Sequence, residues 1–302
     1  MGLTETGQVL VVDMNEADAP RRFSTSLHHS GFAVVVGHGL PTGTIDELTA
    51  EWGAFFDSGV PERFRADADN PWGFHQRDGE LLPDGVTRRD RKQFYHFGLT
   101  QPLPRGVSSA ARELLEPASG VARRLLGWLD DEWPGGSLTD KPSSLSSWIS
   151  PVESVLRLQR YMPYEQPPAA GSIRALAHAD INLLTLLPAP EILGLQIQPV
   201  GGDWIDLEYE PGLIIVNIGE MLQQASNGYY PATQHRVVVR DPRDAMVPRW
   251  SLPMFFHPDD DVVLSPGVTA SEFRTARVAD YQRKGWGVSV GGGSRTDDEG
   301  PR

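Results

Sequence analysis

Three side chains that commonly bind metals, His178, Asp180 and His235, define the chemistry that this chain could carry out. His178 and Asp180 are separated by one residue at the end of an expected strand, so their side chains point the same way. A His-x-Asp pair alone is common by chance, but His235 follows 55 residues after Asp180 on another expected strand. Two imidazoles and one carboxylate form a facial ligand set that suits Fe(II) and leaves coordination positions open for other ligands.

A second pair, Arg249 and Ser251, begins 14 residues after His235 and shares one face of an expected strand. The arginine fork binds a carboxylate with two parallel hydrogen bonds, and the serine hydroxyl adds a further donor. An arginine in an ion pair at a strand end would be the ordinary explanation for Arg249 alone. It does not explain why His-x-Asp, a later His and Arg-x-Ser occur together in this order. We therefore expect a metal site beside a site for a carboxylate.

Composition and charge exclude several other kinds of protein. The 302 residues are enough for one large domain or two small ones. The absence of cysteine excludes disulfides, thiolate metal sites and a cysteine nucleophile. A net charge of −13, from 27 basic and 40 acidic residues, argues against nucleic acid and anionic membranes as partners. The chain has no apolar run of about 18 residues and no signal-like N-terminus, so we expect no membrane association and a cytoplasmic location.

The elements that must position these residues change in character halfway along the chain. Apolar residues at helical spacing predict helices at about 16–30, 42–57 and 107–133, the last interrupted by Pro117, with a buried strand at 32–36. The aromatic-rich stretch 71–97 shows no clear period. The second half predicts short strands bounded by turn residues, at 154–162, 174–178, 183–187, 195–199, 204–207, 213–217, 233–239 and 250–257, followed by a helix at about 271–284.

In combination, these motifs resemble the isopenicillin N synthase-like branch of the Fe(II)/2-oxoglutarate-dependent dioxygenases. The resemblance covers roughly residues 8–288. Besides the His-x-Asp, distal His and Arg-x-Ser residues, it is carried by the segments Gly31-Phe32, Gly37-His-Gly-Leu-Pro41, Val216-Asn-Ile-Gly-Glu-Met-Leu222, Asn227-Gly-Tyr229 and Arg249-Trp-Ser-Leu-Pro-Met-Phe-Phe256.

The resemblance implies a mainly β protein with flanking helices (α+β), built on a double-stranded β-helix (jelly-roll) core. We expect a single oxygenase domain over 1–288, with a helix-rich part at about 1–150, the jelly roll at about 151–260 and a C-terminal helix at about 270–286. Residues 289–302, rich in Gly, Ser and Asp, are expected to be a flexible tail.

The resemblance also implies the roles of individual residues. His178, Asp180 and His235 would be the catalytic metal ligands, binding Fe(II). Arg249, helped by Ser251, would pair with the distal carboxylate of 2-oxoglutarate. Many relatives carry Asn-x-Tyr on an earlier strand, where the tyrosine contacts the co-substrate. Here that tyrosine is Tyr161, and Gln159 replaces the asparagine.

The expected reaction is hydroxylation of a small molecule, or its desaturation or cyclisation, with 2-oxoglutarate and O₂ converted to succinate and CO₂. The expected partner is the substrate alone, without nucleic acid or membrane, and the chain would be a monomer or weak homo-oligomer. Strand alternation and the position of 91–97 in relatives give five candidate substrate contacts, namely Phe94, His96, Arg157, Asn182 and Phe255.

Three alternatives remain open at this point. Isopenicillin N synthase uses its Arg-x-Ser pair for a peptide substrate, so a 2-oxoglutarate-independent iron oxidase has the same motifs. A non-catalytic jelly-roll binding protein is a second alternative, although such a protein has no reason to keep all four of His178, Asp180, His235 and Arg249. A zinc hydrolase would explain two histidines and a carboxylate but not Arg-x-Ser.

Overall fold

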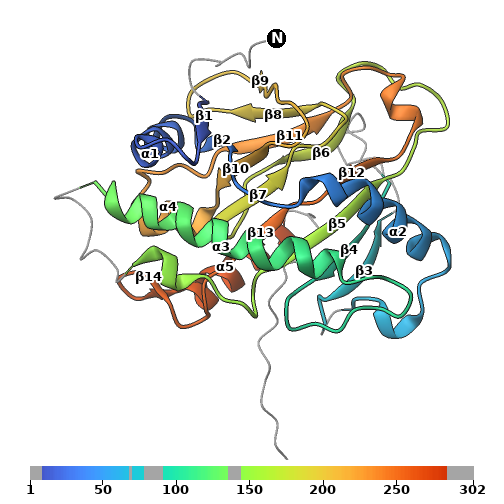
Figure 1. Ribbon diagram of the computed structural model, residues 1–302, viewed down its shortest axis with the longest axis horizontal. Helices are drawn as coiled ribbons and strands as arrows, with labels where there is room; N and C mark the ends of the chain where they lie inside the picture. Colours follow the sequence, from blue (N-terminus) through green and yellow to red (C-terminus); the bar gives the residue numbers. More distant parts are fainter. Residues whose placement is uncertain (1–8, 68–69, 78–90, 135–143, 284–302) are drawn as a thin grey trace, which may run out of the picture.

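The computed structural model describes residues 9–67, 70–77, 91–134 and 144–283, and in this part of the chain two β-sheets face each other (Figure 1). All pairings in the two sheets are antiparallel except that of β1 with β2. The larger sheet has the order β1 (Val11–Asp13), β2 (Phe32–Val36), β10 (Ile214–Ile218), β7 (Leu184–Pro188), β13 (Met254–Phe256), β5 (Val155–Tyr161), β4 (Lys92–Phe97) and β3 (Gly73–Arg77), and β12 (Arg249–Ser251) also pairs with β5.

The smaller sheet has the order β6 (Ile173–His178), β11 (Gln234–Val238), β8 (Leu195–Gln198) and β9 (Ile205–Asp206). A separate pair of strands, β14 (Val263–Ser265) and β15 (Val268–Thr269), precedes the last helix. This arrangement confirms the expected α+β protein with a jelly-roll core.

Five α-helices occur in the described residues, and they are α1 (Ala19–Ser30), α2 (Ile45–Asp57), α3 (Ala110–Asp131), α4 (Glu220–Ala225) and α5 (Ala270–Arg283). Helix α1 ends at Gly31, whose φ of 71° is the left-handed conformation that glycine adopts without strain. Helix α3 continues through Pro117, so the expected interruption does not end it. No helix in the described ranges is both long and apolar enough to cross a membrane.

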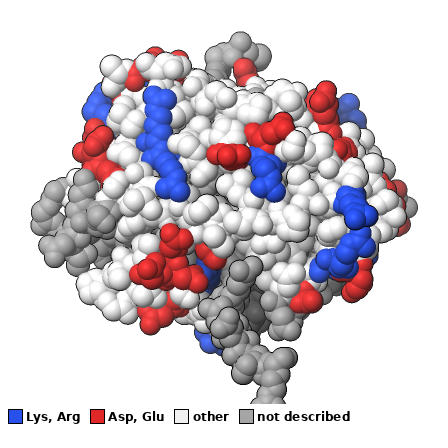
Figure 2. All heavy atoms as spheres, turned by 60° about the horizontal axis from the view of Figure 1, so that its bottom comes forward, with Lys and Arg blue, Asp and Glu red and all other residues white. Residues whose placement is uncertain are grey.

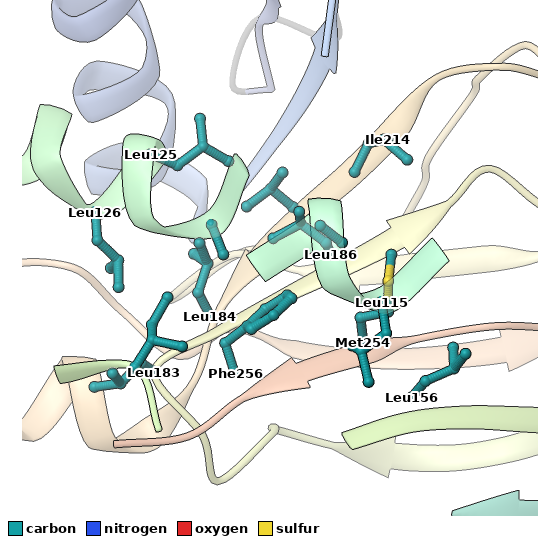
Figure 3. Close-up of a cluster of buried hydrophobic side chains, with 14 of the residues drawn as sticks. Leu115, Leu125, Leu126, Leu156, Leu183, Leu184, Leu186, Ile214, Met254 and Phe256 are labelled. Atoms are coloured by element: carbon teal, nitrogen blue, oxygen red, sulfur yellow. The ribbon is translucent and has the colours of Figure 1, made fainter. Parts of the chain in front are cut away.

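The main core lies between α3 and the larger sheet (Figure 3). The sheet contributes buried side chains from every second residue of its strands. Helix α3 contributes Leu115, Leu125 and Leu126. The sheet residues labelled there are Leu156, Leu184, Leu186, Ile214, Met254 and Phe256. We call this side of the larger sheet its outer face. Because neighbouring strand residues point to opposite sides, Arg157, Thr185, Asn217 and Phe255 lie on the inner face, toward the smaller sheet.

The structure departs from the expected elements in two places that matter for the site. The expected strand 250–257 is divided into β12 and β13 around Leu252 and Pro253, since proline has no N–H for the ladder. The aromatic stretch forms the antiparallel pair β3 and β4, and their connection, 78–90, lies outside the described residues. The expected tail 289–302 also lies outside them.

Candidate functional site

The two candidate histidine ligands are direct cross-strand neighbours in the smaller sheet. His178 at the end of β6 pairs with His235 of β11, and their ring centroids are 4.3 Å apart. Directly opposed residues of an antiparallel pair project to the same side. The antiparallel pairing therefore brings together two imidazoles that are far apart in the sequence.

Asp180 follows β6 and links the two sheets. Its Oδ1 lies 4.0 Å from Nε2 of His178 and 4.0 Å from Nε2 of His235. Its Oδ2 accepts hydrogen bonds from Thr185 Oγ1 at 2.6 Å and from Asn217 Nδ2 at 2.8 Å, both on the inner face of the larger sheet. One carboxylate oxygen is thus held by the sheet while the other faces the histidines.

The backbone around Asp180 is fixed by a close approach of the segment that enters α4. Glu220 N–H donates to the Asp180 carbonyl at 2.7 Å, and Gly219 N–H donates to the Leu183 carbonyl at 3.0 Å. A Cβ on Gly219 would stand 2.0 Å from the Asn182 carbonyl oxygen, so only glycine fits here. The Val216-Asn-Ile-Gly219 segment thus supplies both the Asn217 donor and the space for this loop.

Backbone hydrogen bonds set the tautomers of both histidines. His178 Nδ1 lies 2.8 Å from the Leu176 carbonyl oxygen, and His235 Nδ1 lies 3.3 Å from that of Thr233. A carbonyl oxygen only accepts, so each Nδ1 carries the proton and each Nε2 presents a lone pair. The pKa of His178 is lowered to about 4, mainly by burial and secondly by the neighbouring His235. This imidazole is therefore neutral at neutral pH.

Asp180 remains a carboxylate in the same surroundings. Burial opposes its ionisation, but His235, His178 and the hydrogen bonds from Asn217 and Thr185 outweigh burial and hold its pKa below the usual value. Nε2 of His178 and Oδ1 of Asp180 therefore offer lone pairs at neutral pH, and Nε2 of His235 lies 4.0 Å from the same Oδ1. Ligand atoms of these three residues lie within 4.8 Å of one another and could hold one metal ion. Two nitrogens and one carboxylate oxygen, with no thiolate, fit Fe(II).

The structure places Arg249 and Ser251 beside the tyrosine predicted to act with them. In the pairing of β12 with β5, Arg249 is opposite Tyr161 and Ser251 is opposite Gln159. Arg249 is 2% exposed, and its guanidinium lies 5.6 Å from the centre of the Tyr161 ring. Its Nε donates to the Ile192 carbonyl, but its buried Nη1 has no hydrogen-bond partner among the described residues. A buried charged donor without a partner is costly, so the geometry favours an anionic ligand at this position.

Arg157, one of the candidate substrate contacts, lies on the inner face with aromatic rings around it. Its guanidinium lies 5.1 Å from the Phe94 ring centre and 4.8 Å from that of Phe255. Its Nε donates to His96 Nε2 at 2.8 Å. Phe94 and His96 are 2% and 1% exposed, so they support Arg157 from behind, whereas Arg157 and Phe255 keep some exposed surface.

Asn182 has a different role from the predicted substrate contact. It has no exposed surface, and its Nδ2 donates to the Leu184 carbonyl and to Thr185 Oγ1, both at 2.9 Å. Because the side chain is enclosed behind the Asp180 loop, that prediction is corrected: Asn182 orients Thr185, which in turn holds Asp180.

Three residues at the site were not predicted from the sequence as contributors to it. Thr185 and Asn217 hold Asp180, and each is a single polar residue inside an apolar run, which was an available signal. Tyr209 lies beside Arg249: burial raises the pKa of its phenol, and the positive charge of Arg249 opposes this. No sequence pattern pointed to Tyr209.

Comparison with known proteins gives consistent results. The family model described as the 2OG-Fe(II) oxygenase superfamily matches residues 152–258. A crystal structure from Shewanella oneidensis, whose protein is described as an oxygenase from its family resemblance, is 33% identical in sequence. The match covers 90% of this chain and 98% of that chain, with a TM-score of 0.77. A crystal structure from Caulobacter crescentus, described as a 2OG-Fe(II) oxygenase family protein, is 27% identical in sequence. The match covers 89% of this chain and 98% of that chain, with a TM-score of 0.71. The flavonol synthase/flavanone 3-hydroxylase of Matthiola incana is 28% identical, covering 86% of this chain and 89% of the relative.

Proposed function

Because the chain belongs to the 2OG-Fe(II) oxygenase superfamily, we propose that it oxidises a small organic molecule and converts 2-oxoglutarate and O₂ to succinate and CO₂. Hydroxylation is the outcome that we expect, with desaturation or cyclisation of the substrate as variants of the same oxidation. The observation that carries the proposal is the convergence of His178, Asp180 and His235 between the two sheets, where their ligand atoms lie within 4.8 Å of one another.

The proposal assigns Fe(II) to Nε2 of His178, Nε2 of His235 and Oδ1 of Asp180. Bound Fe(II) would supply the redox chemistry with O₂ that no side chain of this protein can supply. The two Nδ1–H donors keep the imidazoles oriented, and the hydrogen bonds on Oδ2 keep Oδ1 directed at the histidines.

His178 is the most exposed of the three candidate ligands. The side chain of His178 is 37% exposed, whereas those of Asp180 and His235 are 9% and 11% exposed. Co-substrate and substrate would therefore enter on the His178 side and lie between His178 and the inner face of the larger sheet.

The proposal further assigns the distal carboxylate of 2-oxoglutarate to Arg249, Ser251 and Tyr161. The buried Nη1 of Arg249 supports this, because a carboxylate would satisfy a donor that has no partner among the described residues. Arg249 would hold the co-substrate in one orientation, and Tyr161 would line the same position.

Succinate formation tests the proposal. Protein loaded with Fe(II) is incubated with 2-oxoglutarate and O₂, and succinate and O₂ consumption are both measured, with candidate substrates added in turn. We expect one succinate for each O₂ consumed and stimulation by the correct substrate. Consumption of O₂ without succinate would contradict the proposal and indicate a 2-oxoglutarate-independent oxidase.

A further inference from the structure

Tyr209 and Arg249 come together at the end of the jelly roll that lies opposite the candidate iron site. In the pairing of β7 with β10, the first residue of each strand is opposite the last residue of the other, so the loop after β7 and the loop before β10 lie at the same end. A hydrogen bond from Ala189 N–H to the Leu213 carbonyl, at 2.9 Å, joins the two loops. The loop after β7 carries Ile192, whose carbonyl accepts from Arg249 Nε, and the loop before β10 carries Tyr209.

The ring of Tyr209 is fixed by apolar packing between the two sheets. Its side chain is 7% exposed and belongs to a buried cluster with Ile215 of the larger sheet and Ile197 of the smaller sheet. The carboxylate of the preceding residue, Glu208, pairs with Arg240 at 2.9 Å. The Tyr209 hydroxyl is buried and has no hydrogen-bond partner among the described residues.

Arg249 differs from two other buried arginines of the chain, which pair with acidic side chains. Acidic and basic side chains are intermixed on the surface in Figure 2, so charges there have neighbours of opposite sign. Among the buried arginines, Arg160 Nη2 lies 2.6 Å from Asp57, and Arg274 Nη1 lies 2.9 Å from Glu153. Arg249 donates from Nε to a backbone carbonyl, but its buried Nη1 has no partner in the part of the chain that the structure describes.

Tyr209 and Arg249 thus form a pair of buried donors that lack an acceptor. Burial raises the pKa of the Tyr209 phenol, and the nearby charge of Arg249 opposes this, so the hydroxyl keeps its proton at neutral pH. Buried donors without partners are rare in proteins and lower their stability, so such a pair calls for an acceptor from outside the chain. A carboxylate, which accepts several hydrogen bonds, would satisfy both donors.

We propose that the Tyr209 hydroxyl donates a hydrogen bond to the distal carboxylate of 2-oxoglutarate, beside the hydrogen bond from Arg249. Tyr209 would thereby help the site to select a 2-keto acid with a second carboxylate. Because the ring is already fixed by packing, little freedom is lost when the hydroxyl binds the co-substrate. This inference rests on the proposed function, since it adds a residue to the same co-substrate site.

Binding of 2-keto acids to Tyr209→Phe tests this inference separately from turnover. Calorimetry is carried out on the Fe(II)-loaded protein without O₂, with 2-oxoglutarate and with 2-oxopentanoate, which has the same 2-keto acid group and lacks the distal carboxylate. We expect 2-oxoglutarate to bind about 10- to 100-fold more weakly than to the wild-type protein, as loss of a hydrogen bond to a charged group predicts, and 2-oxopentanoate to bind almost equally. Unchanged binding of 2-oxoglutarate, or an equal loss for both acids, would overturn the inference.

Tyr230→Phe is the matched control, because it removes a phenol hydroxyl that has a partner within the protein. The side chain of Tyr230 has no exposed surface, and its hydroxyl is in a hydrogen bond with Ser24 Oγ at 2.8 Å. This variant should keep the wild-type affinity for 2-oxoglutarate. A loss equal to that in Tyr209→Phe would mean that the effect is not specific to the co-substrate site, and the inference would be wrong.

Unfolding of the ligand-free protein in urea distinguishes a binding hydroxyl from a structural one. Removal of an unpaired buried hydroxyl relieves a cost, so Tyr209→Phe should unfold at a urea concentration no lower than that of the wild-type protein. Tyr230→Phe loses a satisfied hydrogen bond and should unfold at a lower concentration. If Tyr209→Phe is destabilised to the same extent, its hydroxyl has a structural role and the inference does not hold.

The wild-type protein distinguishes failure of this inference from failure of the proposed function. If it binds Fe(II) and 2-oxoglutarate, but Tyr209→Phe binds the co-substrate equally well, the proposed function stands and only the role of Tyr209 is wrong. If it binds no 2-oxoglutarate, the proposed function has failed and the inference fails with it.

Discussion

Thr185→Val removes one support of the candidate iron ligand Asp180 with almost no change in side-chain volume. Thr185 Oγ1 donates to Asp180 Oδ2 at 2.6 Å, which is a short, charge-assisted hydrogen bond. Such a bond contributes about 1.5–3 kcal/mol, and loss of a residue that supports a metal ligand typically weakens metal binding about 10- to 100-fold. Asn217 still donates to the same oxygen, so we expect Fe(II) affinity to fall about tenfold, at the lower end of this range.

Competition with a chelator of known affinity, carried out without O₂, measures this change directly. Thr233→Val is the matched control, because Thr233 is 3% exposed and its hydroxyl has no hydrogen-bond partner among the described residues. The control should keep the wild-type Fe(II) affinity. Equal affinities for Thr185→Val, Thr233→Val and the wild-type protein would refute the role given to Thr185, and with it the reasoning that the inner face orients Asp180.

Three further predictions follow from burial and charge. Arg249→Met should weaken 2-oxoglutarate binding about 10- to 100-fold in calorimetry and leave Fe(II) affinity unchanged; equal loss of both would contradict its role as a carboxylate ligand. Burial lowers the pKa of His257 to about 3 from 6.5, so its contribution to stability is present above pH 6.5 and is lost as the pH falls toward 3. Urea unfolding should show about 2 kcal/mol of this loss between pH 7.5 and 5, and His257→Gln should abolish that part of the pH dependence. Leu186→Ala, at a fully buried position between α3 and the larger sheet, should lower the free energy of unfolding by about 2–5 kcal/mol in the same assay, and a loss below about 1 kcal/mol would contradict its place in the core.

The parts of the site that depend on local spacing were the most predictable from the sequence. Strand alternation predicted that His178 and Asp180 point the same way and that Arg249 and Ser251 share a face, and the strands were found close to their expected positions. The same alternation put Arg157 and Phe255 toward the cavity side, and the structure places both on the inner face beside each other.

Features that depend on contacts between distant segments could not be predicted in this way. The burial of Asn182 results from the approach of Gly219 to its carbonyl, which no local pattern encodes. His257, directly after β13, is 4% exposed, and nothing in the local sequence indicates that it is buried. The pair β3 and β4 was missed, since its aromatic residues follow no simple alternation of apolar and polar types.

The central claim is that one iron site binds 2-oxoglutarate through these residues, and visible absorbance tests it most directly. Fe(II)-loaded protein is titrated with 2-oxoglutarate in the absence of O₂, and the weak charge-transfer band of a chelated 2-keto acid is followed. We predict a band that saturates at one equivalent in the wild-type protein and is absent in Asp180→Ala. A protein that binds Fe(II) but gives no band, or an Asp180→Ala variant that gives the same band, would contradict the claim.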